Sequence, residues 1–267
     1  MNVIDSIDIL SEYFNVIRRK RKGVITNFFL NPFKHSLWIE KGELYVVLIH
    51  DCYFIIRKSE LVNYLFYITT DTEQLANGLK EILPTITFQV VIDLVGDMKM
   101  EPLKQIFLEN GFSEFKMIYR MNRVGIPNCL TFDSNVQHAV IEDLNTIHVL
   151  LCKYFNPLLE QIPNKEEIEK FILENQVLIY KQDGKICGFV IFELIGLTLY
   201  LRYWFVSPGF RDLHIGSKLF NAFMYEGRNT KRQLLWVIAD NENAIKRYKH
   251  YGFRAEKMFD YVLMREC

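Results

Sequence analysis

The strongest constraint on the fold is a local pattern that occurs twice in this 267-residue sequence. Residues 107–121 read FLENGFSEFKMIYRM, and residues 248–264 read YKHYGFRAEKMFDYVLM. In each segment a predicted helix stops at a Gly-Phe pair, and a strand with polar and aromatic residues follows. Glycine just past a helix end commonly takes the left-handed cap conformation, so one such pair carries little weight. Two pairs with matching flanking elements predict an internal duplication.

The order of predicted elements supports the duplication, because it is much the same on both sides of a boundary at GIPNC, residues 125–129. The first half is predicted as a helix at about 4–20, strands at 44–50, 53–58 and 64–70, a helix at 72–83, a strand at 86–94, a helix at 100–110 and a final strand. The second half is predicted as a strand at 137–144, helices at 143–155 and 164–175, strands at 177–182, 185–194 and 199–206, a helix at 213–227, a strand at 233–239, a helix at 242–251 and a closing pair of strands. Each half should therefore be a mixed α/β layer, a sheet flanked by helices.

The charge composition argues against a protein whose main role is to neutralise nucleic-acid phosphates. Lysine plus arginine equals aspartate plus glutamate, 32 against 32. One basic run, Arg18 to Lys22, follows an amphipathic segment. It is compatible with an anionic partner and equally with a solvated helix C-terminus, where cations suit the helix dipole.

The five cysteines are scattered and form no Cys-x-x-Cys pair, so the sequence predicts neither a disulfide framework nor a metal site. They are Cys52, Cys129, Cys152, Cys187 and Cys267. Reduced thiols suit a cytoplasmic protein. The first residues lack a signal-peptide pattern, and no apolar run is long enough to predict a membrane span.

The segment VSPGFRDLHIGSKLF, residues 206–220, joins a predicted strand to a predicted helix. A helix N-terminus leaves backbone N–H groups unpaired, with the positive end of the dipole behind them. A phosphate can bind there if nothing bulky covers the backbone. Gly216 permits such an approach, Ser217 adds a hydroxyl and Arg211 adds charge. The alternative is an ordinary helix start with no ligand.

A second segment, residues 237–253, has Asn241, Ala244, Tyr248 and the pair Gly252-Phe253 at regular spacing on a predicted helix. By itself it is an ordinary capped helix. Together, in this order, the two segments resemble the GCN5-related N-acetyltransferase (GNAT) superfamily. Its pyrophosphate motif, Arg/Gln-x-x-Gly-x-Gly/Ala after Val-x-Pro, corresponds to Arg211 through Gly216 after Val206-Ser-Pro208. The resemblance covers residues from about 136 to 267.

The resemblance implies two tandem acyl-CoA N-acyltransferase folds, each a mixed, mostly antiparallel sheet flanked by helices. It implies an acetyltransferase domain at 125–267 that transfers acetyl from acetyl-coenzyme A to an amine. The backbone around Phe205 and Val206 would pair with the pantetheine arm where two strands splay. The amides expected to hold the pyrophosphate, beside Arg211, are those of Asp212, Leu213, His214, Ile215, Gly216 and Ser217. Asn241 would contact the pantetheine or order its loop, and Tyr248 would protonate the departing thiolate.

Two departures from the family pattern matter. His214 stands where the family has its first glycine, and a positive φ there would cost about 1–3 kcal/mol and weaken the case for a working cradle. Arg202, Tyr203 and Trp204 occupy the strand where many relatives carry a glutamate, so the general base is open. Glu193 is the nearest candidate by topology, and a solvent-facing strand end explains it equally well. Tyr248 is either the acid or a packing tyrosine.

In the first half, the corresponding joint has Thr69, Thr70, Asp71 and Glu73 in place of arginine and glycine. Acidic groups near a helix N-terminus satisfy its dipole and exclude a second anion. Residues 1–124 are therefore predicted to be a degenerate GNAT-like domain without the cofactor motif, which either forms a wall of the acceptor cleft or supports the second half.

The acceptor is a small-molecule or peptide amine, and the oligomeric state is open. Aromatic residues near the presumed cleft permit a flat or apolar acceptor, or all belong to the core: Tyr200, Tyr203, Trp204 and Tyr225. One alternative function is a non-catalytic sensor or scaffold that binds acyl-CoA without turnover. A transferase that uses aminoacyl-tRNA is a more distant alternative, suggested only by the basic run.

Overall fold

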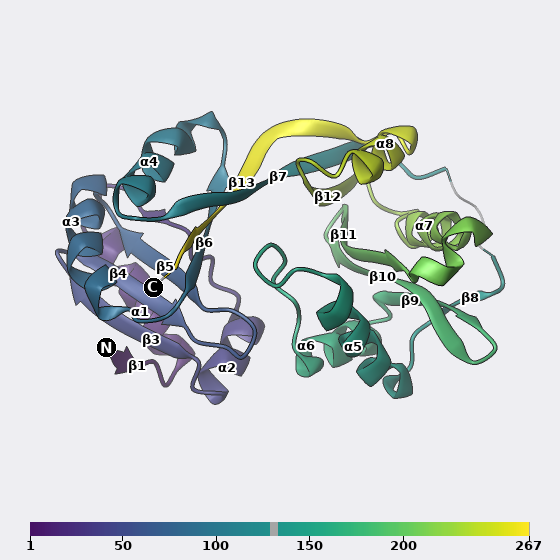
Figure 1. Ribbon diagram of the computed structural model, residues 1–267, viewed down its shortest axis with the longest axis horizontal. Helices are drawn as coiled ribbons and strands as arrows, with labels where there is room; N and C mark the ends of the chain where they lie inside the picture. Colours follow the sequence, from purple (N-terminus) through teal and green to yellow (C-terminus); the bar gives the residue numbers. More distant parts are fainter. Residues whose placement is uncertain (129–132, 267) are drawn as a thin grey trace. The chain divides into compact units, whose positions relative to one another are not determined.

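The computed structural model describes residues 1–128 and 133–266, apart from the side chains of Arg211 and Asp212 (Figure 1). Cys129 and Cys267 lie outside the described residues. The chain forms two compact units, and both are discontinuous in sequence. Unit 1 comprises residues 1–118, 157–159 and 257–267, and unit 2 comprises residues 119–156 and 160–256.

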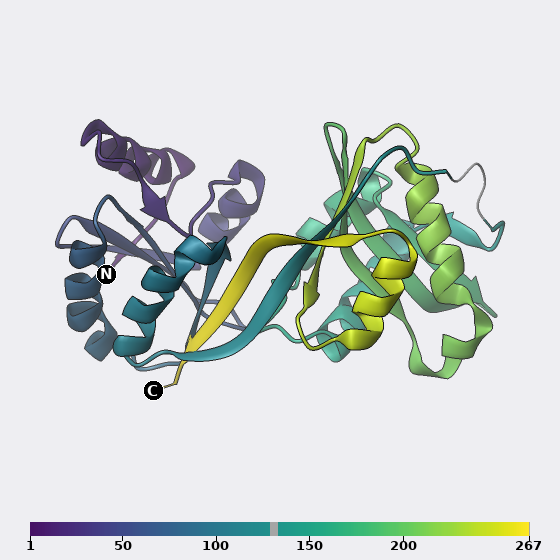
Figure 2. The ribbon, with the colours of Figure 1, turned by 90° about the horizontal axis from the view of Figure 1, so that it is seen from above.

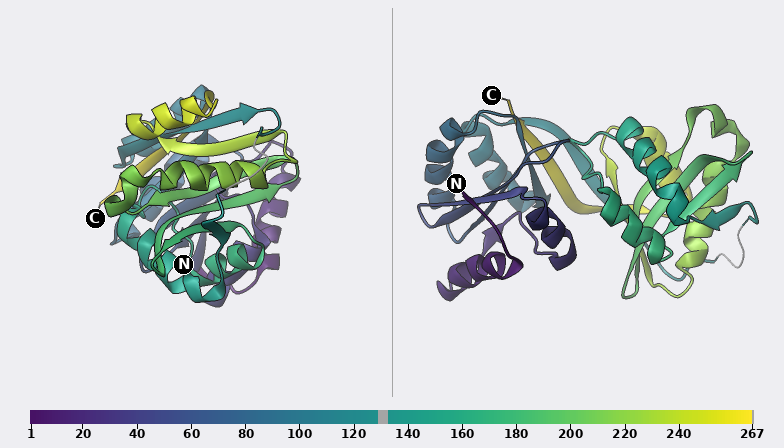
Figure 3. Two further views of the ribbon diagram at one scale, coloured as in Figure 1. Left: turned by 90° about the vertical axis from the view of Figure 1, so that its right-hand side faces the viewer. Right: turned by 90° about the horizontal axis from the view of Figure 1, so that it is seen from below.

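Unit 1 is built on strands in the order β1-β3-β4-β5-β6-β13-β7. Its elements are β1 (Asn2–Val3), α1 (Ile7–Arg19), β2 (Ile25–Thr26), α2 (Pro32–Glu40), β3 (Leu44–Ile49), β4 (Cys52–Arg57), β5 (Tyr64–Thr69), α3 (Thr72–Ile82), η1 (Leu83–Thr85), β6 (Val90–Gly96), η2 (Met98–Met100), α4 (Glu101–Glu109) and part of β7 (Ser113–Val124). The helices α1 and α2 lie on one face of the sheet, and α3 and α4 lie on the other (Figure 3). The sequence predicted neither β1, β2 nor α2.

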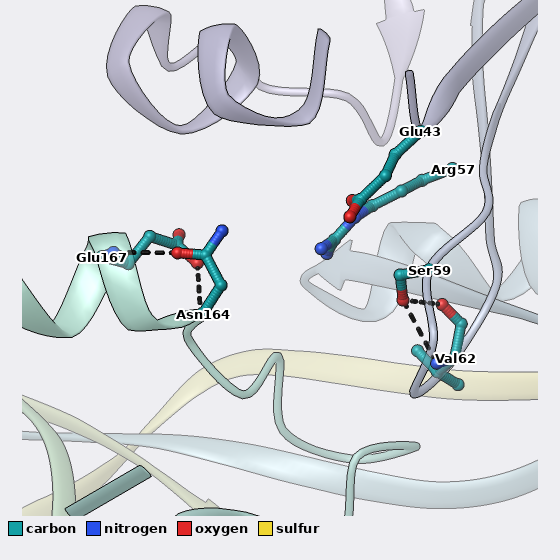
Figure 4. A network of polar contacts seen from close by, with 6 residues as sticks. All are labelled: Glu43, Arg57, Ser59, Val62, Asn164 and Glu167. Atoms are coloured by element: carbon teal, nitrogen blue, oxygen red, sulfur yellow. Dashed lines mark hydrogen bonds and ion pairs between the residues drawn. The ribbon is translucent and has the colours of Figure 1, made fainter. Parts of the chain in front are cut away.

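A buried ion pair joins the ends of β3 and β4 in unit 1. The Nε of Arg57 lies 2.8 Å from Oε2 of Glu43, which precedes β3 (Figure 4). The guanidinium of Arg57 also lies 3.9 Å from the ring centre of Trp38 in α2. Stacking on an indole suits a planar, weakly hydrated cation, so this contact fixes α2 against the sheet.

Unit 2 has strands in the order β7-β12-β11-β10-β9-β8. Its elements are β8 (Val136–His138), η3 (Ile141–Asp143), α5 (Leu144–Tyr154), α6 (Lys165–Leu173), β9 (Val177–Gln182), β10 (Lys185–Ile195), β11 (Thr198–Val206), η4 (Pro208–Leu213), α7 (Ile215–Glu226), β12 (Arg232–Ile238), α8 (Glu242–His250) and the start of β13 (Arg254–Arg265). The helix α7 covers one face of β9, β10 and β11, and α5 and α6 cover the opposite face (Figure 1).

Local sequence explains where these helices begin. A capping box starts α6: Oδ1 of Asn164 accepts a hydrogen bond from the N–H of Glu167 at 2.8 Å, and Oε2 of Glu167 accepts from the N–H of Asn164 at 2.9 Å (Figure 4). Two helix N–H groups are thereby satisfied reciprocally. The basic run lies at the other end of a helix. Arg18 and Arg19 are in the last turn of α1, where cations suit the helix dipole, and Nζ of Lys20 lies 2.9 Å from Oδ1 of Asp51. Among the described residues, no helix is long and apolar enough to cross a membrane.

The closing pair of strands predicted after α8 is wrong, because the chain ends in one long strand, β13. Its part from Phe259 to Arg265 pairs with β6 in unit 1, and its first residues belong to unit 2. The long strand β7 is divided in the same way: residues up to Ile118 belong to unit 1, and later ones to unit 2. In the strand order β13 therefore stands between β6 and β7, and β7 stands between β13 and β12 (Figure 2).

This reciprocal exchange explains why the compact units do not follow the proposed division of the sequence at 124/125. Each half of the sequence supplies one long strand after its Gly-Phe pair, and each unit takes the far end of the other half's strand. In unit 1 the place of a second closing strand is taken by β13 of the second half, and in unit 2 it is taken by β7 of the first half. The repeated local pattern is therefore the structural basis of the exchange.

A carboxylate in unit 2 joins the three strands where β7 is inserted. Glu256 of β13 accepts hydrogen bonds from Arg120 and Asn122 of β7 and from Arg232 of β12. The carboxylate side chain is 17% exposed. Removing it would deprive the guanidinium groups of Arg120 and Arg232 of their common counter-ion.

We expect Glu256→Ala to lower the free energy of unfolding by about 2 kcal/mol, since two partly buried cations lose their common partner. Urea titration followed by far-ultraviolet circular dichroism would measure it. Glu242→Ala is the matched control, because its pair with Lys246 is 3.7 Å long and both side chains are largely exposed. Equal effects of the two substitutions would contradict the role of Glu256 in holding β7.

Candidate functional site

The site in unit 2 begins where two parallel strands stop pairing. The register of β11 with β12 runs from Thr198 opposite Arg232 to Leu201 opposite Leu235, and no pairing continues along the rest of β11. Strand β11 extends to Val206 and β12 to Ile238. The two strands therefore diverge and leave one edge of β11 without a strand partner over its last residues.

A β-bulge in β11 lies at the start of this gap. On β10, Phe192 pairs with Leu201 and the preceding Ile191 pairs with Tyr203, so Arg202 is the extra residue. The bulge moves later side chains to the opposite faces of the sheet. Leu201 packs in the core under α7, whereas Tyr203 packs in the core under α5 and α6.

The hydrogen bonds of β11 show which backbone groups face the gap. The N–H of Ser207 donates to the carbonyl of Cys187 on β10 at 2.8 Å. Backbone groups in a strand alternate between its two edges, so those of Phe205 also face β10, and those of Trp204 and Val206 face the gap. The backbone of Val206 therefore faces the gap and that of Phe205 faces β10, while the ring of Phe205 packs beside Tyr154 and Phe189 on the α5 and α6 side. Both residues stay predictions as cofactor contacts.

The predicted cradle lies in the turn from η4 to α7. Its backbone leads into the first turn of α7, and no described side chain caps this helix. Ile215 is buried in the core, Gly216 is half-buried, and Leu213, His214 and Ser217 are exposed. The N–H groups of a first helical turn have no partner within the helix, so those of Gly216 and Ser217 are available to an anion.

His214 has φ of +56° and ψ of +14°, in the left-handed region. His214 therefore has the positive φ that, as argued from the sequence, weakens the case for a working cradle. Histidine is among the non-glycine residues enriched in this region, so the cost lies near the low end, about 1 kcal/mol. His214 is exposed.

Gly216 and Trp204 form the floor beneath the start of α7. A Cβ on Gly216 would lie 3.4 Å from Cζ2 of Trp204 and 3.5 Å from Cγ2 of Val206. A methyl group fits at these distances, and a larger side chain would fill the space. The indole Nε1 of Trp204 is buried, with no hydrogen-bond partner in the described part of the chain. A buried donor without an acceptor is costly unless a ligand or water supplies one.

Tyr248 of α8 lies on the same side as this floor. Its ring centre is 5.8 Å from that of Trp204 and 6.1 Å from that of Phe253, and the side chain is buried. Burial, with repulsion from Glu160 in addition, raises the pKa of the Tyr248 phenol above its usual value. The phenol therefore keeps its proton at neutral pH. Asn241 caps α8, with Oδ1 accepting from the N–H of Ala244 at 3.1 Å, which matches the loop-ordering alternative.

Glu193, the predicted base, is paired rather than isolated. Its Oε2 lies 3.5 Å from Nε of Arg202, the bulged residue, and both side chains are half-buried. Tyr200 stands opposite Glu193 in the register of β10 and β11, several residues before the gap-facing Trp204. Glu193 is therefore several residues along the sheet from Trp204, the residue whose ring lies beside Tyr248.

Sequence reasoning missed a second carboxylate, Glu160, in the loop between α5 and α6. Burial raises the pKa of Glu160 to about 7. The loop is tied to β11, because the hydroxyl of Tyr203 donates to the carbonyl of Gln161 at 2.8 Å. Glu160 also acts electrostatically on both Tyr203 and Tyr248. A single acid in the otherwise uncharged stretch FNPLLEQIP was the only sequence signal.

Unit 2 contains together the gap between β11 and β12, a start of α7 that no described side chain caps, and the tyrosine of α8. The sequence profile of the acetyltransferase (GNAT) family matches residues 144–253, which span all three. Residues 144–253 are a GNAT domain. The match agrees with the predicted resemblance, and it includes every residue from Phe205 to Tyr248 proposed for the site.

Solved structures extend the GNAT likeness over the whole chain. A GCN5-related N-acetyltransferase from Sphaerobacter thermophilus is 13% identical, with 81% of this chain and 76% of that chain covered and a TM-score of 0.59. An acetyltransferase from the GNAT family from Colwellia psychrerythraea is 12% identical, covering 100% and 99%, with a TM-score of 0.59. A tandem GNAT protein from the clavulanic acid biosynthesis pathway is 8% identical, covering 80% and 78%, with a TM-score of 0.56. No curated protein matches the sequence.

These identities establish the fold alone: a mixed, mostly antiparallel sheet flanked by helices, as found in GNAT and tandem GNAT proteins. The family match supports an acyltransferase in general terms. In the described part of the chain, no three His, Cys, Asp or Glu side chains gather as metal ligands would. That the protein binds no metal remains a prediction from the sequence.

We expect the left-handed conformation at His214 to make glycine better than alanine there. His214→Gly should unfold with a free energy about 1 kcal/mol higher than His214→Ala, since both remove the imidazole and only alanine strains a positive φ. Urea unfolding would compare them. At Ser217, inside α7, the order should reverse, with alanine better than glycine by about 1 kcal/mol. Alanine favoured at both positions would contradict the left-handed turn.

Proposed function

We propose that the protein transfers an acetyl group from acetyl-coenzyme A to the amine of a small-molecule or peptide acceptor. The observation that carries the proposal is the gap between β11 and β12 beside the start of α7, which no described side chain caps. A pantetheine arm can pair with the gap-facing backbone of Trp204 and Val206 as an added strand. A diphosphate suits the amides at the start of α7, from His214 to Ser217, because that end of the helix is positive.

The other predicted cofactor residues enter the proposal with the roles that the resemblance implies. Arg211 supplies positive charge, and the amides of Asp212 and Leu213 contribute to the same cradle. Gly216 leaves the backbone open to a phosphate, and Ser217 adds a hydroxyl. The buried Nε1 of Trp204 supports the proposal, because it offers a hydrogen-bond donor directly beneath the cradle.

Acetyl-coenzyme A, when bound, supplies an activated acyl thioester. In the proposed reaction the amine nitrogen attacks the thioester carbonyl carbon, and the carbon–sulfur bond breaks. Glu160 takes the proton that leaves the nitrogen, and Tyr248 donates one to the departing sulfur. A carboxylic acid with a pKa of about 7 is well matched to a base at neutral pH, and a phenol with a raised pKa stays protonated until it is needed.

The domain roles remain those predicted from the sequence. We propose residues 125–267 as the acetyltransferase domain of a cytoplasmic protein, and residues 1–124 as a degenerate GNAT-like domain without the cofactor motif. Tyr203 is buried in the core, and Trp204 is assigned to the cofactor cradle, which leaves Tyr200 and Tyr225, both half-buried, as the aromatic candidates to contact an acceptor.

Binding tests the cradle directly. We expect Gly216→Trp to abolish acetyl-coenzyme A binding in isothermal titration, because the indole would occupy the space above Trp204 and Val206. Gly216→Ala is the matched control: its methyl group fits at 3.4 Å, so its dissociation constant should stay within about fivefold of the wild type. Arg211→Glu should weaken binding at least tenfold. Unchanged binding in both Gly216→Trp and Arg211→Glu would refute the cradle.

The base can be identified from pH dependence. Because Glu160 must lose its proton to act, kcat/KM should rise with pH through about 7. Glu160→Gln should lower kcat by about 10²–10⁴ and remove this limb of the profile. Glu193→Gln should leave the limb in place. A profile that loses its limb in Glu193→Gln, with Glu160→Gln active, would assign the base to Glu193 instead.

A second function is a sensor or scaffold that binds acyl-CoA without turnover, and the left-handed His214 is the observation that favours it. In that case acetyl-coenzyme A would bind, but no free thiol would form with a broad panel of amines. Amine-dependent thiol release above the rate of hydrolysis alone would decide for the enzyme.

A further inference from the structure

Unit 1 contains the counterpart of the gap in unit 2. Its parallel strands β5 and β6 are paired only at Tyr64 opposite Val91, although β5 continues to Thr69 and β6 to Gly96. The other edge of β5 is taken by β4, which pairs with it from Tyr64 to Ile68. The edge of β5 that faces the gap therefore needs another partner.

That partner is a segment of the same chain. The short strand β2 pairs antiparallel with the end of β5, with Ile25 opposite Thr69 and Thr26 opposite Ile68. Because β4 holds the opposite edge, β2 must lie on the edge that β6 leaves open. An extended segment thus runs along β5 at the place where an added strand would enter.

The side chain of Asn27 spans the gap. Its Nδ2 donates to the carbonyl of Leu65 on β5 at 3.2 Å and to the carbonyl of Asp93 on β6 at 3.3 Å. Its Oδ1 accepts from the N–H of Tyr67 at 2.9 Å. The hydroxyl of Thr26 donates to the carbonyl of Tyr67 at 2.6 Å. An amide and a hydroxyl of the protein therefore satisfy the backbone groups that an amide-bearing ligand would otherwise bind.

The helix that follows β5 is also satisfied internally. Oδ1 of Asp71 accepts hydrogen bonds from the N–H groups of Glu73 at 2.7 Å and Gln74 at 3.3 Å at the start of α3. In unit 2 no described side chain caps the corresponding helix, α7. A carboxylate at this position excludes a second anion from the helix end, because it is itself the anion.

Phe28 anchors the inserted segment. Its ring is 1% exposed and packs between Phe14 of α1, His35 of α2 and Phe66 of β5, with ring centres 6.3, 4.3 and 5.1 Å away. Burial, with the charges of Lys34 and Arg57 in addition, lowers the pKa of His35 to about 3. The ring is therefore neutral at physiological pH, and its Nδ1 accepts from the N–H of Asn31 at 3.1 Å.

We infer that unit 1 keeps the strand gap of an acyl-CoA groove and fills it with its own residues 25–28, with Asp71 in the place of the diphosphate. We call residues 25–28 the plug. The chain then binds one acetyl-coenzyme A, in unit 2, and not two. This inference rests on the proposed function only in identifying the gap as a former cofactor groove. The plug itself consists of hydrogen bonds within the protein, so it can be tested without any ligand.

Amide hydrogen exchange of the full-length protein tests the plug. In the wild type, the Tyr67 amide should be protected by Oδ1 of Asn27. Asn27→Gly should speed its exchange at least tenfold, because that amide loses its acceptor. Asn63→Ala is the matched control: Asn63 donates from Nδ2 to the carbonyl of Gln89 in the same unit without touching Tyr67. Its effect on the Tyr67 amide should stay within twofold.

Exchange with saturating acetyl-coenzyme A separates this inference from the proposed function. We expect slower exchange at Gly216 and Ser217 and no change at Tyr67, Glu73 and Gln74, with one ligand per chain in titration. Fast exchange of Tyr67 in the wild type, equal to that in Asn27→Gly, would overturn the plug. So would two ligands per chain with slower exchange at Glu73 and Gln74. If acetyl-coenzyme A slows exchange nowhere, the proposed function fails, while the comparison of Asn27→Gly with Asn63→Ala still decides the plug.

Discussion

Both units of this protein contain a pair of parallel strands that stop hydrogen bonding partway along, and the rest of the structure depends on how the exposed edge is satisfied. Backbone N–H and C=O groups removed from water need partners. In unit 1 the chain supplies them through Thr26 and Asn27. In unit 2 no described strand pairs with that edge of β11 beyond Leu201, and no described side chain caps the adjoining helix start, so both can serve a ligand. One architectural feature thus becomes a structural joint in one half and a candidate site in the other.

The exchange of long strands makes the two halves interdependent at the level of secondary structure. Each half of the sequence ends in one long strand, β7 or β13, although a pair of closing strands was predicted for the second half. The place of the second closing strand in each unit is taken by the long strand of the other half. The first half therefore contributes to the sheet of unit 2, whether or not it binds a cofactor. Its strand β7 supplies Arg120 and Asn122, which hold Glu256 within the sheet of unit 2.

Most elements could be predicted because their signals are local. The strands are dense in β-branched and aromatic residues, the helices carry apolar periodicity, and the Gly-Phe pairs mark helix ends. The elements that were missed, β2 and α2, depend on distant partners: Ile25 and Thr26 form a strand only against β5. In the candidate site, the motif predicted Val206, Gly216 and Tyr248. It could not show that the backbone of Phe205 faces β10, because which edge of a strand a residue faces depends on a bulge at Arg202 that no local pattern announces.

The sequence by itself determined the duplication, the family resemblance and the positions of the helix start and the phenol, since each is carried by residues at fixed spacing. Only the tertiary structure decided three further matters. It showed that the gap in unit 1 is filled by its own chain and that His214 takes a left-handed conformation. It also placed a carboxylate, Glu160, in a buried loop whose surroundings raise its pKa to about 7. The physical reason is common to all three, because desolvation, strand pairing and backbone strain are set by neighbours distant in sequence or by the turn as a whole.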